Sequence, residues 1–228
     1  FVDGGSDHVN IGTSSDLGGT FNVSGTAVIS TADNTDTLTL ISTDADANVG
    51  PNLRLYRNSS SPADEDFLGA IEFEGRNDNS QDFVAARLFA YSTDVSDGSE
   101  DATLQIGMMK AGSQHLAVEI TPDAFIINNG GVDLDFRVES DDNTHMIFVD
   151  AAEDHVNIGT STDLGGVLNV LSTDNTQTLV LASTDADANP GPKLELYRNS
   201  SSPADNDYLG NIYFSYEDDG GNQATGFG

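Results

Sequence analysis

Three kinds of residue are missing or scarce in this sequence of 228 residues: cysteine, tryptophan and basic residues. The absence of cysteine excludes disulfide bonds, thiolate zinc sites and cysteine nucleophiles. The absence of tryptophan and an aromatic content of 7% leave few rings on which a polysaccharide could stack, which argues against an enzyme that degrades polysaccharides. No apolar run approaches the roughly 20 residues of a membrane-spanning helix, so we expect no membrane insertion.

The charge of the chain is strongly one-sided. It has 38 acidic and 8 basic residues, for a formal net charge of −30 at pH 7. Because a polyanion repels phosphate, the sequence argues against binding to nucleic acid and to an anionic membrane surface. Such a charge is typical of a solvated exterior that keeps closely packed copies soluble; binding of divalent cations is the alternative.

The sequence repeats itself over long segments. Residues 1–23 and 148–170 agree at 17 of 23 positions, and residues 33–74 and 174–215 agree at 31 of 42. A long period with near-copy identity is typical of a modular array, in which one unit is stacked along an axis. Arrays of this kind build length and surface and seldom form one buried catalytic pocket, so we expect no enzyme.

The repeat divides the chain into β modules. Module A covers residues 1–74 and recurs at 148–215, module B covers 75–147, and residues 216–228 resemble the start of a second, truncated module B. Residue 1 falls inside the repeat, because its counterpart Phe148 follows THMI in the other copy. We therefore expect the sequence to be part of a longer protein. Intact mass spectrometry of the source protein tests this, and a mass near 24.0 kDa would refute it.

Apolar and polar residues alternate with a period of two along much of the chain. This pattern predicts short β-strands with one buried face, and no segment keeps a helical apolar stripe over three turns. We therefore predict an all-β fold of elongated, repeated β-modules. The segment Ser60–Gly69 is the nearest candidate for a helical turn, and a loop is the alternative. Strands are predicted at residues 36–42, 52–58, 70–75, 103–109, 115–121 and 134–140.

Turn signals separate these strands. The pairs Gly18–Gly19, Gly50–Pro51 and Gly165–Gly166 mark tight reversals of the chain. Asn129–Gly130 predicts a two-residue hairpin, because both residue types tolerate a positive φ. The density of such signals favours many short strands over a few long elements.

The core that the chain can form by itself is thin. Leu, Ile, Val and Phe make up roughly a quarter of it, above the roughly 20% at which disorder becomes the default. A narrow repeated unit has much surface for its volume, so we expect copies of the chain to shield one another's apolar rows. The residues expected to pack in this way are Leu38, Leu40, Leu53, Leu55, Ile71, Phe73, Leu179, Leu181, Leu194, Leu196, Ile212 and Phe214.

Four segments carry a resemblance to a known group of proteins. They read DHVNIGTSTDLGG, LYRNSSSPADNDYLGNIYF, DVSDGSEDATLQIGM and VDLDFRVESDDNTHMIFVD, and they resemble repeats in tail-fibre and other virion structural proteins of marine bacteriophages. Related repeats also occur in bacterial surface proteins. The resemblance implies an interleaved, parallel homotrimeric fibre with apolar side chains on its threefold axis. It also implies a place in the virion, outside the cell, with other virion or fibre proteins as partners and only indirect contact with a host receptor.

Two acidic segments imitate the start of a calcium loop. The sixth loop position, which should be Gly, is Val49 or Pro190, and the acidic twelfth position is Leu55 or Leu196, which excludes an EF-hand. A looser Ca²⁺ site of oxygen ligands stays open, against a polar turn whose side chains bond locally to the backbone. The candidate ligands are Asp44, Asp46 and Asn48, and their counterparts Asp185, Asp187 and Asn189. No other cofactor is expected.

A second acidic cluster, Asp97, Glu100 and Asp101, lies in SDGSED. We expect a hairpin tip there, and a cation site is the alternative.

The four histidines have no metal-binding spacing. His8 and His155 occupy equivalent positions in DHVNIG, while His115 and His145 stand alone. A paired histidine could serve as a ligand or general base, but we expect histidines at strand edges or at interfaces between copies.

Arg57 and Arg198 are scarce positive charges in the two YRNSSSPAD segments. We expect each to form an ion pair with a nearby carboxylate. Together with Tyr56, Tyr197 and the following asparagines they also form a patch that could contact sugars.

The sequence thus predicts a structural shaft segment of a trimeric phage tail fibre or virion appendage that supports host attachment. The alternative is a bacterial extracellular surface or matrix adhesin that binds glycans or calcium.

Overall fold

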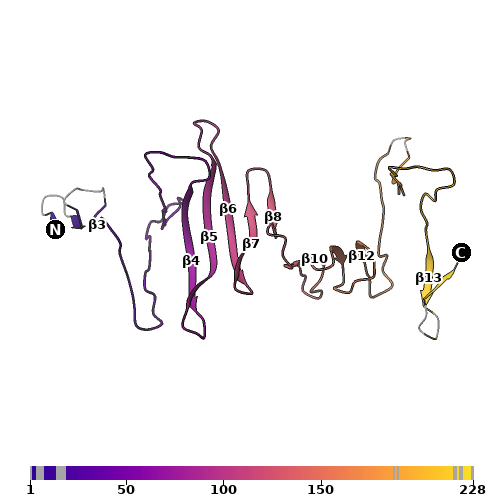
Figure 1. Cartoon of the computed structure of the whole chain (residues 1–228), viewed down its shortest axis with the longest axis horizontal. Coiled ribbons are helices and arrows are strands. Elements are labelled where there is room, and N and C mark those ends of the chain that lie inside the picture. The colour runs from indigo at the N-terminus through magenta and orange to yellow at the C-terminus, as the bar shows by residue number, and fades with distance from the viewer. Residues whose placement is uncertain are drawn as a thin grey trace. The chain divides into compact units, whose positions relative to one another are not determined.

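The structure is a computed structural model of the chain that describes residues 2–3, 8–13, 19–186, 188, 190–217, 220 and 223–226. In this part of the chain the regular elements are all β-strands (Figure 1), which confirms the all-β class. None of the described residues belongs to a helix that could cross a bilayer. The chain divides into two units, residues 1–106 with 120–123 and residues 107–119 with 124–228.

The first sheet is three-stranded. It contains β1 (Val2–Asp3), β2 (His8–Ile11) and β3 (Phe21–Val23) in that order. β2 is antiparallel to β1 and parallel to β3. A parallel pair cannot be closed by a tight hairpin, so β2 and β3 are joined by a crossover, of which the structure describes residues 12–13 and 19–20.

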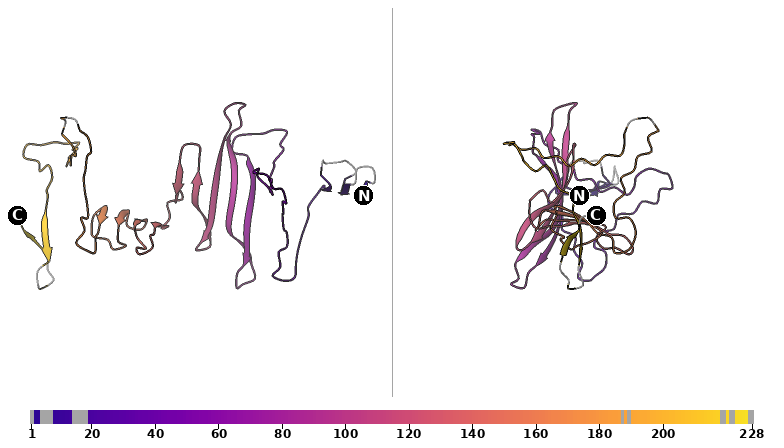
Figure 2. Two further views of the ribbon diagram at one scale, coloured as in Figure 1. Left: turned by 180° about the vertical axis from the view of Figure 1, so that it is seen from behind. Right: turned by 90° about the vertical axis from the view of Figure 1, so that its right-hand side faces the viewer.

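The largest sheet has the strand order β4-β5-β6-β7-β8. Its strands follow one another in sequence, and Figure 2 shows them from two further directions. Sequential neighbours of this kind are joined by short loops, which the Gly- and Asp-rich turns supply. The strands are β4 (Phe67–Arg76), β5 (Asp82–Asp94), β6 (Asp101–Lys110), β7 (Ser113–Ile120) and β8 (Phe125–Ile127).

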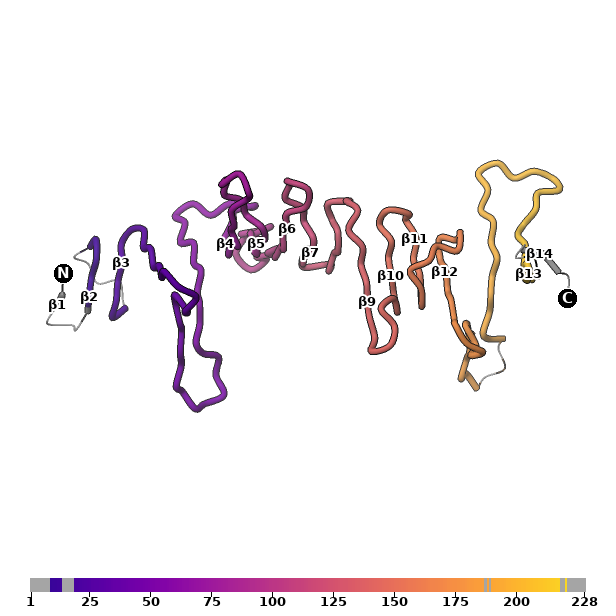
Figure 3. The backbone as a smooth tube through the Cα atoms, turned by 90° about the horizontal axis from the view of Figure 1, so that it is seen from below, coloured from indigo at the N-terminus to yellow at the C-terminus, as the bar shows by residue number. Residues whose placement is uncertain are grey.

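Two smaller sheets contain the remaining strands. The four-stranded sheet has the order β12-β11-β10-β9, seen along the tube of Figure 3. β10 is antiparallel to both β9 and β11, whereas β11 and β12 are parallel. The last sheet is the antiparallel pair β13–β14. The bounds are β9 (Phe136–Val138), β10 (Ile147–Asp150), β11 (His155–Ile158), β12 (Leu168–Val170), β13 (Phe214–Glu217) and β14 (Gln223–Gly226).

The pairing of β4 with β5 sorts their side chains onto two faces. Ile71 lies opposite Leu88, and Phe73 lies opposite Ala86, so these four share one face. The other face carries the Glu72–Arg87 ion pair, whose atoms are 3.1 Å apart. Phe73 remains 61% exposed on the apolar face.

The predicted strands fare differently in the two modules. Those at residues 70–75, 103–109 and 115–121 are confirmed by β4, β6 and β7, and 134–140 contains β9. Those at 36–42 and 52–58 are wrong for the single chain, because residues 26–62 form no backbone–backbone hydrogen bond with any described residue. A strand requires a neighbour, and the described chain supplies none there.

Two local predictions also have an outcome. Ser60–Gly69 holds no helical turn; a turn with Glu65 at φ 66° leads directly into β4. The hairpin at Asn129–Gly130 is wrong, because this turn connects β8 to β9, which belong to different sheets. Its positive φ values fall instead on Asn128 and Gly131, and the N–H of Gly131 donates to the Asn128 carbonyl at 3.0 Å.

The hairpin β13–β14 pairs in the same register as the hairpin β4–β5. Glu217 pairs with Gln223 and Tyr216 with Ala224, whereas Arg76 pairs with Asp82 and Gly75 with Phe83. These positions correspond under the offset of the sequence repeat. Equivalent residues therefore pair in the same way at both places.

Candidate functional site

Buried asparagine pairs join the parallel strands in both copies of the repeat. Asn157 on β11 lies opposite Asn169 on β12, and the Nδ2 of Asn169 donates to the Oδ1 of Asn157 at 2.7 Å. Asn22 and Asn10 make the same bond at 2.6 Å between β3 and β2. All four side chains are buried, and Asn157 is fully so. Burying an amide costs free energy unless it is hydrogen-bonded, so each pair favours the parallel register, while the Nδ2 of Asn157 is buried without a partner among the described residues.

The same asparagines also fix the crossover. The N–H of Gly166 donates to the Oδ1 of Asn169 at 3.0 Å, and the Nδ2 of Asn169 donates to the Gly166 carbonyl at 2.8 Å. Gly19 and Asn22 form the equivalent two bonds. We call residues 8–24 and 155–171 the asparagine-paired segments.

Glycine is required where these segments turn. Gly159 follows β11 with φ +81°, in the left-handed region that disfavours other residues. A Cβ there would overlap the carbonyl oxygen of Leu171, and one at Gly12 would overlap that of Ser24. The recurring N-I-G sequence therefore combines one buried amide with one backbone contact that no side chain permits.

One histidine contacts the crossover. His155 Nδ1 lies 3.1 Å from Oδ1 of Asp163. The pKa of Asp163 is held below its ordinary value, chiefly by the hydrogen bond from the N–H of Gly165 and further by the nearby His155. This contact joins β11 to the crossover loop at Asp163. Within the described residues, no third acidic or histidine side chain lies with them to form a metal site.

The other histidines are dispersed. His145 lies edge-on to Phe148 with ring centroids 5.2 Å apart, and its Nδ1 is 2.9 Å from the hydroxyl of Thr144. His115 is part of β7, and the side chain of His8 lies outside the described residues. The structure therefore does not bring two described histidine side chains together.

The first calcium candidates form a series of local turns. The N–H of Asp46 donates to Oδ1 of Asp44 at 3.3 Å, and the N–H of Asn48 donates to Oδ1 of Asp46 at 2.8 Å. Each carboxylate thus bonds the backbone two residues further on, as in Asx turns. In the second copy the N–H of Asp185 bonds Oγ of Ser183 at 3.2 Å, and Asp187 and Asn189 lie outside the described residues.

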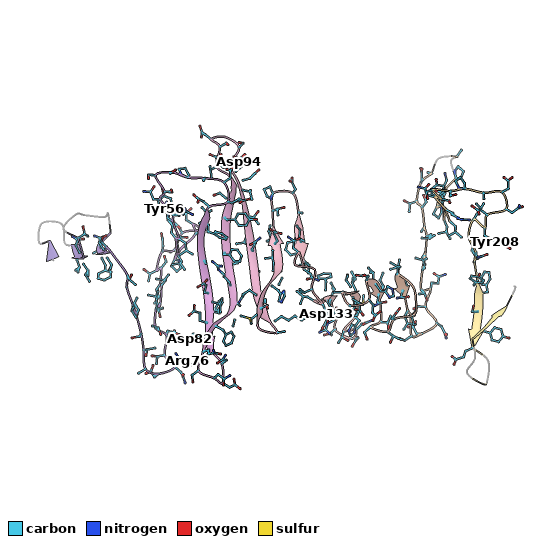
Figure 4. All side chains as sticks on the ribbon, in the orientation of Figure 1. Tyr56, Arg76, Asp82, Asp94, Asp133 and Tyr208 are labelled. Atoms are coloured by element: carbon cyan, nitrogen blue, oxygen red, sulfur yellow. The ribbon has the colours of Figure 1, made fainter. Side chains whose placement is uncertain are left out.

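The cluster in SDGSED lies in the connection between β5 and β6. There the N–H of Gly98 donates to Oε2 of Glu100 at 3.1 Å, and the N–H of Ser96 to Oδ1 of Asp94 at 2.7 Å. The Ser96 hydrogen bonds hold the pKa of Asp94 below its ordinary value. Asp97 and Glu100 thus lie in the loop between two adjacent strands and Asp101 is the first residue of β6, beyond the end of β5 marked by Asp94 in Figure 4.

Two arginines clamp the turns that follow the extended parts of the chain. Arg57 pairs with Asp66 at 2.8 Å and donates to the Phe67 carbonyl at 2.9 Å. Arg198 pairs with Asp207 at 3.3 Å and donates to the Tyr208 carbonyl at 2.9 Å. The predicted ion pairs are confirmed, and both are within one chain.

The predicted sugar-binding patch does not assemble in the predicted form. Arg57 is engaged by the clamp, while the guanidinium of Arg54 lies over the Tyr56 ring, 4.4 Å from its centroid. The hydroxyl of Tyr56 donates to Oδ1 of Asn58 at 3.3 Å. Residues with a spacing of two therefore meet, as on one face of an extended chain.

All the residues of the predicted apolar rows are exposed in the single chain. Their exposed fractions run from 38% at Ile71 to 70% at Leu179. Phe148 is the one large apolar side chain that is buried among the described residues. The residues that the sequence predicted to pack between copies are thus left exposed by the single chain.

Sequence reasoning missed the asparagine pairs and a further polar cluster. Oδ1 of Asp33 accepts hydrogen bonds from the hydroxyls of Thr31 and Thr35 at 2.8 and 2.5 Å, which lower its pKa. Asp174 repeats this with Thr176. The recurrence of asparagines twelve residues apart in both copies was the signal that could have found the pairs.

Comparisons with protein-family models, with curated proteins and with solved structures found no match for this chain.

Proposed function

We propose that this chain is a structural segment of a trimeric fibre, such as a phage tail fibre or another virion appendage that supports host attachment. In this role it acts outside the cell and beside other fibre or virion proteins. Its function is mechanical, since it holds a distal receptor-binding part away from the particle. Its functional residues are the apolar rows, and no residue acts as a catalyst.

The exposure of the apolar rows carries this proposal. Sheets become stable by packing an apolar face against another layer, yet Phe73 on β4 and Leu55 before it are each more than half exposed. Full burial of a Leu or Phe side chain contributes about 1.5–3 kcal/mol. A set of twelve such positions is therefore large enough to drive association between copies.

The extended segments support the same conclusion. We use this name for residues 26–62 and their described counterparts 173–186, 188 and 190–203. They keep the alternating leucines of a strand, such as Leu38 and Leu40, but no backbone–backbone hydrogen bond joins residues 26–62 to any described residue. Strands from other copies would pair their backbone groups and cover their leucines together. Interleaving of this kind also removes exposed strand edges.

A parallel trimer is the state to test. Sedimentation equilibrium of the 228-residue chain in 1 M NaCl should give three times the 24.0 kDa of one chain, because at that salt concentration the Debye length is about 3 Å and repulsion between like-charged copies is screened. Electron microscopy of the source particle should place the protein on an appendage. A monomer whose leucines are protected from solvent would contradict the proposal.

A further inference from the structure

Residues 52–58 and 193–199 are held in the same way in the two copies. A Cβ at Gly69 would lie 3.1 Å from the Cβ of Leu55, and one at Gly210 would lie 3.5 Å from the Cβ of Leu196. The arginine clamps fix the next turn in each copy, one of them on the carbonyl of Tyr208, which Figure 4 labels. Leucine and clamp arginine thus face the residues after the turn, 66–69 in the first copy and 207–210 in the second, and the alternate residues face away from them.

We call these alternate residues the outer rows. In the first copy the outer row is Asn52, Arg54, Tyr56 and Asn58, of which the last three are joined by the cation–π contact and the hydroxyl bond described above. Arg54 forms no ion pair with a described carboxylate, although the chain has 38 acidic residues. Tyr56 is 65% exposed. The row therefore presents a cation that no described carboxylate pairs with, beside an accessible aromatic ring.

The second outer row has a carboxylate, Glu195, where the first has Arg54. Tyr197 and Asn199 repeat the first row, and Lys193 stands at the position of Asn52. Across the aligned segments 33–74 and 174–215, Arg54 and Glu195 are the one pair in which a residue of one sign is replaced by a residue of the other. Glu195 and Tyr197 are exposed, as their counterparts are.

We propose that the two outer rows bind each other between two copies of the chain, with Arg54 of one copy paired with Glu195 of another. Copies aligned at equal height, as in the proposed trimer, place Arg54 beside Arg54. The complementary contact requires copies displaced by one repeat, so it joins assemblies side by side with a stagger. This inference goes beyond the proposed function, and it requires only that copies associate.

The charge reversal also selects the kind of partner. A site for an anionic ligand common to both modules would keep its cation next to the Tyr in the row, whereas the second copy has a carboxylate there, with Lys193 two residues before it, and keeps Tyr and Asn. A charge reversal beside the same Tyr and Asn is what mutual recognition requires. One exposed ion pair is weak, but complementary charges select orientation and partner, and contacts repeated along long assemblies act together.

Charge exchange tests the contact. Arg54→Glu and Glu195→Arg each place like charges at positions 54 and 195, whereas a mixture of the two variants again offers Arg54 to Glu195. The double variant R54E/E195R restores opposite charges at the two positions with their signs exchanged. Sedimentation velocity at about 0.15 M salt, where the Debye length is about 8 Å, would follow species larger than the basic assembly. The concentration at half-association should rise about tenfold for each single variant and return in the mixture and the double variant.

Matched controls hold the net charge. Arg76→Glu equals Arg54→Glu in charge, and Asp205→Arg equals Glu195→Arg; both should leave the association unchanged. Absence of charge-dependent association by the unchanged chain would overturn the inference. So would a loss confined to Arg54→Glu, accompanied by binding of polygalacturonate that Glu195→Arg does not alter, since that result assigns the row to an anionic glycan. Whether the chain forms a trimer is measured separately, by its mass at sedimentation equilibrium in 1 M NaCl.

Discussion

The asparagine-paired segments and the extended segments solve the same problem in different ways. Residues 155–171 pair their backbone in parallel strands and bury an amide network within one chain. Residues 26–62 have neither a ladder nor buried leucines. The first region can hold its conformation with its own hydrogen bonds, while the second depends on what packs against it. The difference teaches that stability of one chain and stability of its assembly reside in separate stretches of sequence.

The largest expected effect lies in the extended segments. Leu55→Asp should weaken association by about 3 kcal/mol or more, because each copy would bring a carboxylate into the apolar contact. Sedimentation equilibrium measures the change. Val49→Asp is the matched control, since Val49 lies outside the apolar rows and proline replaces it in the other copy. Equal association of both variants would contradict the assigned role of the rows.

The asparagine pair should matter within one chain. Asn169→Ala should lower the free energy of unfolding by about 1–3 kcal/mol, because it leaves the buried Oδ1 of Asn157 without its donor. Denaturant unfolding at constant protein concentration measures this change. The exposed Asn199→Ala should have little effect. If Asn169→Ala disrupted assembly without altering unfolding, the division between the two regions would be wrong.

The crossover beside that pair should respond to acid. The pKa of Asp163 lies below its ordinary value of 3.8 in the folded chain, so its stabilising contribution is present above that value and lost as pH falls through the lower, folded pKa. Asp163→Asn should therefore be less stable than the unchanged chain at pH 7, and the two should converge below pH 3.8. Thermal unfolding as a function of pH measures the gap. Asp205→Asn, at a carboxylate that bonds no described residue, should show no such gap at pH 7.

The smallest effect is expected at the end of β4. Arg76 and Asp82 are paired at 2.7 Å, with both side chains more than 60% exposed, at the turn labelled in Figure 4. Exposed pairs of this kind contribute about 0.2–1 kcal/mol. Arg76→Ala should change the midpoint of unfolding only slightly, and less still in 1 M salt. A large loss there would show that the turn carries stability assigned here to other regions.

Alternation of residues predicted the strands of the largest sheet only in part. β4, β6 and β7 alternate and were predicted, whereas β5 was missed because apolar residues fall on both of its faces, as in Phe83, Val84, Leu88 and Phe89. A strand with apolar residues on both faces shows no alternation that the pattern could detect. The extended segments were predicted as strands because apolar and polar residues alternate in them. Whether a segment forms a strand also depends on a neighbouring strand that pairs with it, and the sequence of the segment does not specify that neighbour.

The asparagine pairs could not be predicted by alternation. A polar residue at every second position is normally interpreted as facing water. Asn157 is fully buried instead, because its amide meets another amide on a parallel strand. The clamp arginines were predicted to form ion pairs, because an acidic chain offers a cation many carboxylates. Which carboxylate Arg57 pairs with could not be predicted, since it depends on the turn that places Asp66 beside it.

Residues 26–62 fold back on themselves near Gly50: a Cβ added at Gly50 would lie 3.4 Å from Oγ of Ser42. No backbone–backbone hydrogen bond to a described residue holds this reversal. Drawn out straight, these residues would span roughly 120 Å of contour length. When a single chain is stretched, these unpaired residues would extend at low force, before the hydrogen bonds of any paired strand break. Neighbouring copies that lock the reversal would make the same polypeptide nearly inextensible.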